Sequence, residues 1–115
     1  MKTNLIYLAC PYSNKIGSIK YKRFKTVNKV AAKLMKKGYC IFSPISHSTP
    51  IELHGKVHGD WNFWKKQDSC ILERCDRLFV LKLRGWKKSV GVTAEIEIAK
   101  KLGIPIKYIN KKDYI

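Results

Sequence analysis

The stretch NLIYLAC, residues 4–10, followed by Pro11, decides the fold class of this 115-residue chain. Most of its residues are apolar, and the run is shorter than the roughly ten residues that a helix usually needs. Proline cannot continue a central strand, so the run ends at Pro11. A short apolar run of this kind is typical of a strand buried on both faces, as in a parallel sheet.

Helical and strand patterns alternate downstream of this first strand. Apolar residues recur at helical spacing through residues 19–38 and again through residues 89–103, with lysines between them, which predicts two amphipathic helices that end at glycines. A third helix is predicted over residues 60–75, because Asp60 suits the N-terminal cap. Short apolar runs predict three further strands, at residues 39–43, 78–83 and 104–109.

The segment from Pro44 to Gly59 has no helical or strand period. It contains two prolines, two glycines and three histidines, so it is predicted to be a long loop, and loops of this length in compact domains are usually functional.

The order of elements predicts a single α/β domain over residues 1–115. We expect a Rossmann-like or flavodoxin-like three-layer sandwich, with a four- or five-stranded parallel sheet between helices. Ligands of such sheets bind beyond the carboxyl ends of the strands. This rim is predicted to comprise residues 10–14, 43–48 and 84–89.

Lysine and arginine outnumber acidic residues by 24 to 8, which gives a formal net charge of +16. This charge predicts attraction to polyanions, whether nucleic acid, an acidic membrane surface or a phosphorylated small molecule, and does not choose among them. No apolar run approaches the roughly 18 residues of a membrane span, and the N-terminus lacks signal-peptide organisation. We therefore expect a cytoplasmic protein that does not enter the membrane.

Three segments carry the functional signal: IYLACPYS (residues 6–13), QDSCILERCD (residues 67–76) and SVGVTAEIEIA (residues 89–99). Together they resemble the nucleoside 2-deoxyribosyltransferase superfamily, including its deoxynucleoside-monophosphate N-hydrolases and CMP N-glycosidases, and most of all a small uncharacterised branch of it. The resemblance implies an enzyme that cleaves the N-glycosidic bond of a nucleotide or deoxynucleotide, by hydrolysis or transfer, without a cofactor. It also implies a homo-oligomer, at least a dimer.

The resemblance assigns catalytic roles to one residue in each segment. Glu95 corresponds to the carboxylate that attacks the anomeric carbon, and Tyr7 to the tyrosine that orients this nucleophile. Asp68, eight residues before Asp76, corresponds to an acid that engages the base or ribose and helps to protonate the leaving base. A retaining glycosyl transfer uses such a pair of acids. The alternatives are core packing for Tyr7 and solvated surface positions for the two carboxylates.

The resemblance also implies a phosphate site at the start of the last helix. Ser89, six residues before Glu95, corresponds to the serine that binds the 5′-phosphate in members that use monophosphates. Physical chemistry agrees, because the free N–H groups and positive dipole end of a helix attract anions, and Gly91 allows close approach.

The loop after the first strand, residues 10–14, departs from these relatives, which carry a glycine, serine and arginine arrangement there. Ser13 is a candidate donor to the phosphate in its place. Arg23, or the basic turn at residues 84–88, is a candidate source of positive charge.

Two further residues are candidates for contacting a substrate. His47 follows the second strand at the predicted rim, and Trp64 offers a face on which a base could stack. Core packing or a subunit interface is the alternative for this tryptophan. His54 and His58 are four residues apart, but no cysteine or carboxylate completes a ligand set, so no metal site is predicted.

Two other classes of function remain as alternatives. One is a non-catalytic protein that binds a nucleotide or a nucleotide-derived signal at the same rim. The other is an accessory protein that binds nucleic acid through its +16 charge. Release of free base separates an enzyme from a binding protein, and the salt dependence of DNA and RNA binding tests the third class.

Overall fold

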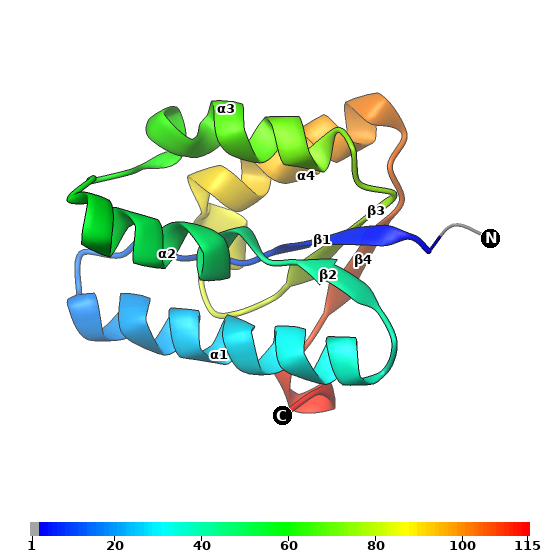
Figure 1. The fold of residues 1–115 in the computed structure, drawn as a ribbon, viewed down its shortest axis with the longest axis horizontal. Coiled ribbons are helices and arrows are strands. Elements are labelled where there is room, and N and C mark those ends of the chain that lie inside the picture. The colour runs from blue at the N-terminus through cyan, green and yellow to red at the C-terminus, as the bar shows by residue number, and fades with distance from the viewer. Residues whose placement is uncertain (1–2) are drawn as a thin grey trace.

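The computed structural model describes residues 3–115, which form a sheet between two layers of helices (Figure 1). Helix α1 lies on one side of the sheet, and α3 and α4 lie on the other (Figure 1). The elements are β1 (Leu5–Ala9), α1 (Gly17–Lys36), β2 (Cys40–Phe42), α2 (Pro44–Gly55), α3 (Trp61–Leu72), β3 (Arg77–Leu81), η1 (Trp86–Lys88), α4 (Val90–Leu102), β4 (Ile106–Ile109) and η2 (Lys111–Asp113).

The sheet has four parallel strands in the order β2-β1-β3-β4. The predicted α/β fold with a parallel sheet of four or five strands is therefore confirmed. In β1, Tyr7 is in register with Phe42 of β2 on one side and with Leu78 of β3 on the other. The strand β2 lies on one side of β1, and the later strands β3 and β4 lie on the other, so the strand order reverses at β1. An open parallel sheet has its ligand crevice at such a reversal.

Alternate residues of β1 face opposite layers of the molecule. Ile6 and Leu8 belong to the cluster beneath α1, whereas Tyr7 and Ala9 belong to the cluster beneath α3 and α4. This is the period-two alternation of any strand, and it explains why the continuous apolar run in β1 predicts burial on both faces. It also directs the Tyr7 side chain toward α4.

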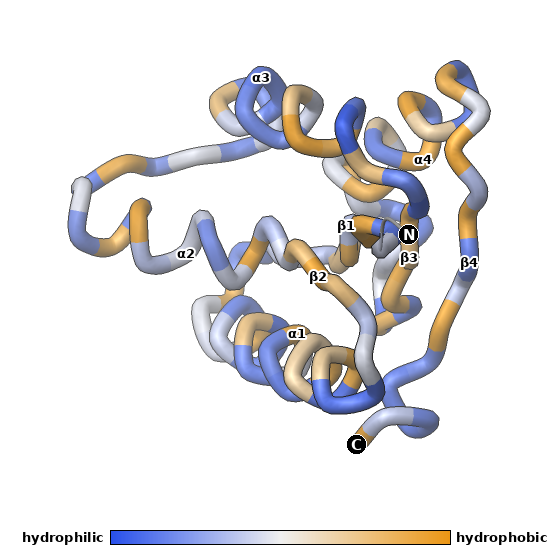
Figure 2. Tube along the Cα trace, turned by 45° about the vertical axis from the view of Figure 1, so that its right-hand side comes forward, coloured by the Kyte–Doolittle hydropathy of each residue, from blue (hydrophilic) through white to orange (hydrophobic). Residues whose placement is uncertain are grey.

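Helix α1 buries one stripe against the sheet and exposes its lysines. Its blue and orange positions alternate along the helix in Figure 2, as expected for an amphipathic helix. The helix is followed by Gly38, whose φ of +98° lies in the region that favours glycine. The buried stripe consists of Val27, Val30, Ala31 and Leu34.

The predicted loop from Pro44 to Gly59 is wrong for most of its length, because Pro44–Gly55 forms α2. Proline is tolerated in the first helical turn, because the N–H groups there have no intrahelical acceptor and none is lost. Pro44 is therefore compatible with a helix. Pro50 lies inside the helix. The helix ends at Gly55 and is capped by Lys56, whose φ is +55°, and Val57 N donates to Glu52 O at 3.0 Å.

The other predicted helices and strands occur within a few residues of their expected bounds. The helix expected over residues 60–75 is shorter, spanning Trp61–Leu72, and Asp60 caps it as predicted by accepting a hydrogen bond from Phe63 N at 3.1 Å. Within residues 3–115, no helix is both long enough and apolar enough to cross a membrane.

Candidate active site

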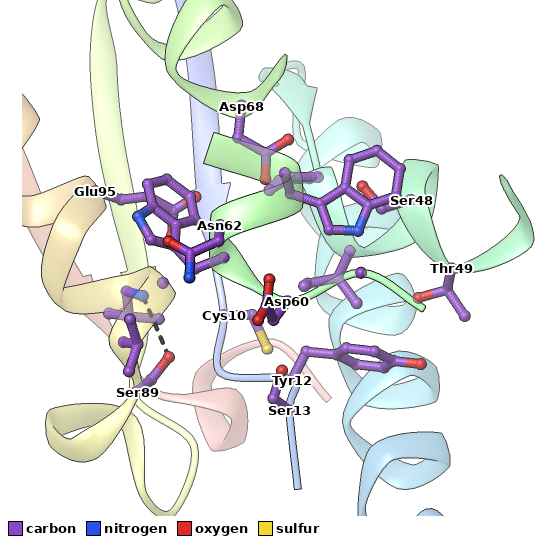
Figure 3. Close-up of a pocket in the computed structure, with 18 of the residues that line it drawn as sticks. Cys10, Tyr12, Ser13, Ser48, Thr49, Asp60, Asn62, Asp68, Ser89 and Glu95 are labelled. Atoms are coloured by element: carbon purple, nitrogen blue, oxygen red, sulfur yellow. Dashed lines mark hydrogen bonds between the residues drawn. The ribbon is translucent and has the colours of Figure 1, made fainter. Parts of the chain in front are cut away.

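A cavity of about 470 Å³ lies at the reversal of strand order, bordered by the segment after β1, by α2, by α3 and by the start of α4. This volume is in the range of small-molecule sites, roughly 300–1,000 Å³. Asp68, Ser89 and Glu95 line the cavity together, although they come from different parts of the chain (Figure 3). The two further predicted contacts Ser13 and Trp64 also line it, as does Gly91.

Glu95 lies in the wall of the cavity and is hydrogen-bonded to Tyr7. The Tyr7 hydroxyl donates to Glu95 Oε2, although 88 positions separate the two residues in the sequence. Tyr7 is 0% exposed and Glu95 is 5% exposed, so this bond is shielded from bulk water. The phenol therefore fixes the direction in which the carboxylate points.

Burial dominates the protonation behaviour of this pair. Loss of hydration raises the pKa of Glu95 to about 8; the hydrogen bond from Tyr7 opposes the increase, and the nearby charge of Asp68 adds to it. Burial also raises the pKa of Tyr7 well above its usual range, and the charge of Glu95 acts in the same direction. Tyr7 therefore keeps its proton and acts as a hydrogen-bond donor.

Asp68 lies on α3, close enough to Glu95 for its charge to raise the pKa of that carboxyl. Its side chain is 8% exposed, and its Oδ1 atom is buried without a hydrogen-bond partner among the described residues. Burial raises the pKa of Asp68 to about 6. Unpaired buried polar groups are costly to a fold, so this acid in the cavity lining is a candidate to bond a ligand.

The start of α4 presents an anion-binding geometry. Ser89 is the N-terminal cap, and its Oγ accepts a hydrogen bond from Val92 N at 3.2 Å. Lys88 and Gly91 line the cavity beside it. A Cβ built on Gly91 would meet only the Trp61 ring, at 3.7 Å, which is an ordinary contact. The glycine therefore leaves space for an approaching ligand, and its backbone does not require the small residue.

Two predicted substrate contacts are not in the cavity wall. His47 is exposed, and its ring packs on Phe42 with the ring centroids 5.6 Å apart. It does not line the cavity because the segment expected to be a loop is a helix, which turns this side chain outward.

Arg23 is also absent from the cavity wall. Its guanidinium donates to Ser13 O at 3.0 Å and to Arg84 O at 2.8 Å. These bonds tie the segment after β1 to the segment after β3. Arg23 thus braces the rim, and its donors are engaged by backbone carbonyl groups.

Sequence reasoning missed the contribution of α2 to the cavity. Ser48, Thr49 and Glu52 line it, and none of them was predicted as a site residue. A signal was present, since Ile45, Ser48, Thr49 and Glu52 recur at the spacing of one helical face. The pattern was hard to recognise because most members of this stripe are polar, whereas buried helix faces are usually apolar.

Among residues 3–115, no group of three or more histidine, cysteine, aspartate or glutamate side chains is arranged to hold a metal ion. The cavity is lined by two buried acids, the start of a helix and several hydroxyl groups.

The fold and the cavity define a small α/β protein with an open parallel sheet and a two-acid pocket at the reversal of strand order. The chain belongs to the DUF1937 family, described as a domain of unknown function, whose model matches residues 4–111. No curated protein matches this sequence.

Among solved structures, the chain is similar to the 2-deoxyribosyltransferase from the psychrotolerant bacterium Bacillus psychrosaccharolyticus. The TM-score is 0.65 and the identity is 24%; the match covers 92% of this chain and 72% of that chain. This likeness confirms the deoxyribosyltransferase-like fold that the sequence resemblance implied.

Proposed function

We propose that this protein cleaves the N-glycosidic bond of a nucleotide or deoxynucleotide, with Glu95 as the nucleophile. The observation that carries the proposal is a buried carboxylate that a buried tyrosine aims into a ligand-sized cavity, next to a second buried acid. A buried, desolvated acid pair in a cleft is more common at functional sites than elsewhere. The deoxyribosyltransferase-like fold supports the same chemistry.

The proposed reaction has two steps. Ionised Glu95 attacks the anomeric carbon while the bond from this carbon to the base breaks, and the electron pair leaves with the base nitrogen. The reacting form has Glu95 ionised and Asp68 protonated, which is the minor form of the free protein at neutral pH because the pKa values are about 8 and about 6. From this form Asp68 donates its proton to the departing base. Water or a second base then attacks the anomeric carbon and releases the Glu95 carboxylate; the proton of an attacking water passes to Asp68. Tyr7 orients Glu95 through both steps.

The remaining cavity residues are proposed to bind the substrate. Ser89 and the backbone N–H groups beside Gly91 face a 5′-phosphate, and Lys88 adds positive charge. Ser13 and Trp64 are further substrate contacts. Arg23 is proposed to hold the rim in place through its bonds to Ser13 O and Arg84 O.

Incubation with a panel of ribonucleoside and deoxynucleoside monophosphates tests the proposal. Chromatography should detect free base and the corresponding sugar phosphate in equal amounts for at least one member. A parallel reaction with an added second base distinguishes transfer from hydrolysis. Sedimentation of the same sample checks the proposed homo-oligomeric state.

One observation favours a second candidate function, non-catalytic nucleotide binding. Burial raises the pKa of Glu95 to about 8, so most molecules of the free protein hold a protonated Glu95 at neutral pH. A protonated carboxyl group is not an effective nucleophile. Tight binding of a monophosphate with no base released between pH 6 and about 9, one unit above that pKa, would favour this second function.

Ser89→Ala is expected to weaken the binding of a nucleoside monophosphate about tenfold and to change the binding of the matching nucleoside by less than about twofold. The reason is that only the phosphate contacts the start of α4. Titration calorimetry with both ligands measures the two affinities. The substitution also removes a helix cap, which costs about 1 kcal/mol of stability.

Ser89→Asp is the matched variant for this measurement. Aspartate is as good a cap as serine, but its charge repels a phosphate. It should therefore preserve stability and weaken monophosphate binding further. Equal losses for monophosphate and nucleoside in both variants would contradict a phosphate site at Ser89.

A further inference from the structure

One face of α2 is turned toward the cavity, and most of this face is polar. Ile45, Ser48, Thr49 and Glu52 share this face, and all four line the cavity. Figure 3 shows Ser48 and Thr49 on the opposite side of the cavity from Glu95 and Ser89. A ligand that reaches Glu95 with its sugar and the start of α4 with a phosphate therefore has α2 as the wall facing its remaining part.

The two hydroxyl groups on this face have no hydrogen-bond partner in the described structure. Ser48 is 7% exposed, and both its Oγ and Thr49 Oγ1 are buried and unbonded. Ser46, on another face of the same helix, is fully engaged, since its Oγ is hydrogen-bonded to Asn28 Oδ1 and to Ser43 Oγ. Burying a hydroxyl group without a partner destabilises a fold, so the Ser48 and Thr49 hydroxyls are candidates to bond a ligand in the cavity that these residues line.

The Trp64 ring next to these hydroxyls is hydrogen-bonded to α2. Glu52 Oε2 accepts a hydrogen bond from Trp64 Nε1 at 2.8 Å and another from Gly59 N at 3.0 Å. A Cβ on Gly59 would lie 2.1 Å from Trp64 Nε1, so only glycine fits there. The indole N–H is already bonded, so Trp64 offers the ligand an aromatic surface and not a donor.

We propose that the polar face of α2 recognises the base: the Ser48 and Thr49 hydroxyls hydrogen-bond the polar edge of a planar heteroaromatic ring, which stacks on Trp64. Glu52 is the positioning residue that holds Trp64 in place. This inference rests on the proposed function, since it takes Glu95 to face the sugar. Aromatic side chains stack on any base, so the hydroxyl groups supply the polar contribution to recognition.

The test compares ligands with and without a base. Titration calorimetry measures the affinities of four deoxynucleoside 5′-monophosphates and of 2-deoxyribose 5-phosphate, with every protein in a Glu95→Gln background to prevent turnover. Ser48→Ala combined with Thr49→Val should weaken the tightest-binding monophosphate about 10- to 100-fold, because two hydrogen bonds are lost. The affinity for 2-deoxyribose 5-phosphate should change by less than about twofold, because that ligand does not reach α2.

Matched variants separate recognition from damage to the fold. Ser46→Ala removes bonded hydroxyl interactions from the same helix and should leave the ratio of the two affinities unchanged. Glu52→Leu frees the indole and should reduce only monophosphate binding, whereas Glu52→Gln keeps an acceptor oxygen and should restore most of it.

Four outcomes would overturn the inference. Equal losses for both ligands in the Ser48 and Thr49 double variant would show that the hydroxyls support the fold, and no loss for either ligand would show that they bind only water. Equal affinity of the parent for both ligands would show that the base is not recognised, while the sugar-phosphate site stands. Binding of neither ligand by the parent would overturn the proposed function together with this inference.

Discussion

Glu95→Gln is expected to slow base release by at least about 10⁴-fold, while nucleotide affinity stays within about threefold of the wild type. The amide has the shape of the carboxyl group and can still accept the hydrogen bond from Tyr7, but it cannot serve as an anionic nucleophile. Single-turnover release of free base measures the first effect, and titration calorimetry measures the second. Glu97→Gln is the matched control, since Glu97 is an exposed residue on the same helix.

A covalent trap gives an independent check on the same role. A substrate analogue with fluorine at the 2′ position should leave its sugar attached to the wild-type peptide that contains Glu95, seen as an increase in mass. The Glu95→Gln variant should show no such adduct. Full base release by Glu95→Gln would contradict the nucleophile assignment, whereas a wild type inactive on every nucleotide would favour the binding function.

The same substitution is expected to stabilise the protein at alkaline pH, by on the order of 4 kcal/mol at about pH 9. Glu95 is 5% exposed, and its ionised form lacks the hydration that water would give it. Glutamine is neutral at all pH values and avoids this penalty. Functional groups in active sites commonly reduce the stability of the folded protein.

The direction of the pH effect follows from the two pKa values. The pKa of Glu95 is raised from 4.5 to about 8 by folding, so between these values the folded protein holds a proton that the unfolded chain has released. Wild-type stability therefore falls as pH rises through this window. The difference in free energy of unfolding between Glu95→Gln and the wild type grows accordingly. Below about pH 4 both states are protonated, and this difference should disappear.

Urea denaturation of the wild type, Glu95→Gln and Glu97→Gln at about pH 4 and about pH 9 measures this effect. The Glu97→Gln protein should follow the wild type at both values, because its side chain is exposed. If the free energy of unfolding of Glu95→Gln differs from that of the wild type by the same amount at both pH values, the prediction is contradicted. Such a result would show that the carboxyl group is adequately solvated or bonded when it ionises.

The local sequence was sufficient to predict the fold class and most elements. The run in β1 is apolar at successive positions because both of its faces are covered, and the buried stripe of α1 recurs every three or four residues because one side of a helix meets the sheet. Ser89 and Glu95 are six residues apart at the start of one helix, so their placement at the same end of the sheet was also predictable. These features depend only on the geometry of a single element.

Only the tertiary structure decided which side chains meet across elements. The bond between Tyr7 and Glu95 depends on the rotation of α4 about its axis, and the burial of Asp68 depends on how α3 packs beside α4. The placement of α2 in the cavity wall and of Arg23 outside it was not predictable for a related reason. A helix that presents hydroxyl groups to a ligand has no apolar stripe, and a charged side chain can brace two backbone segments as readily as it can bind a phosphate. Local periodicity records burial against the protein itself, so it does not reveal a helix face whose partner is a ligand.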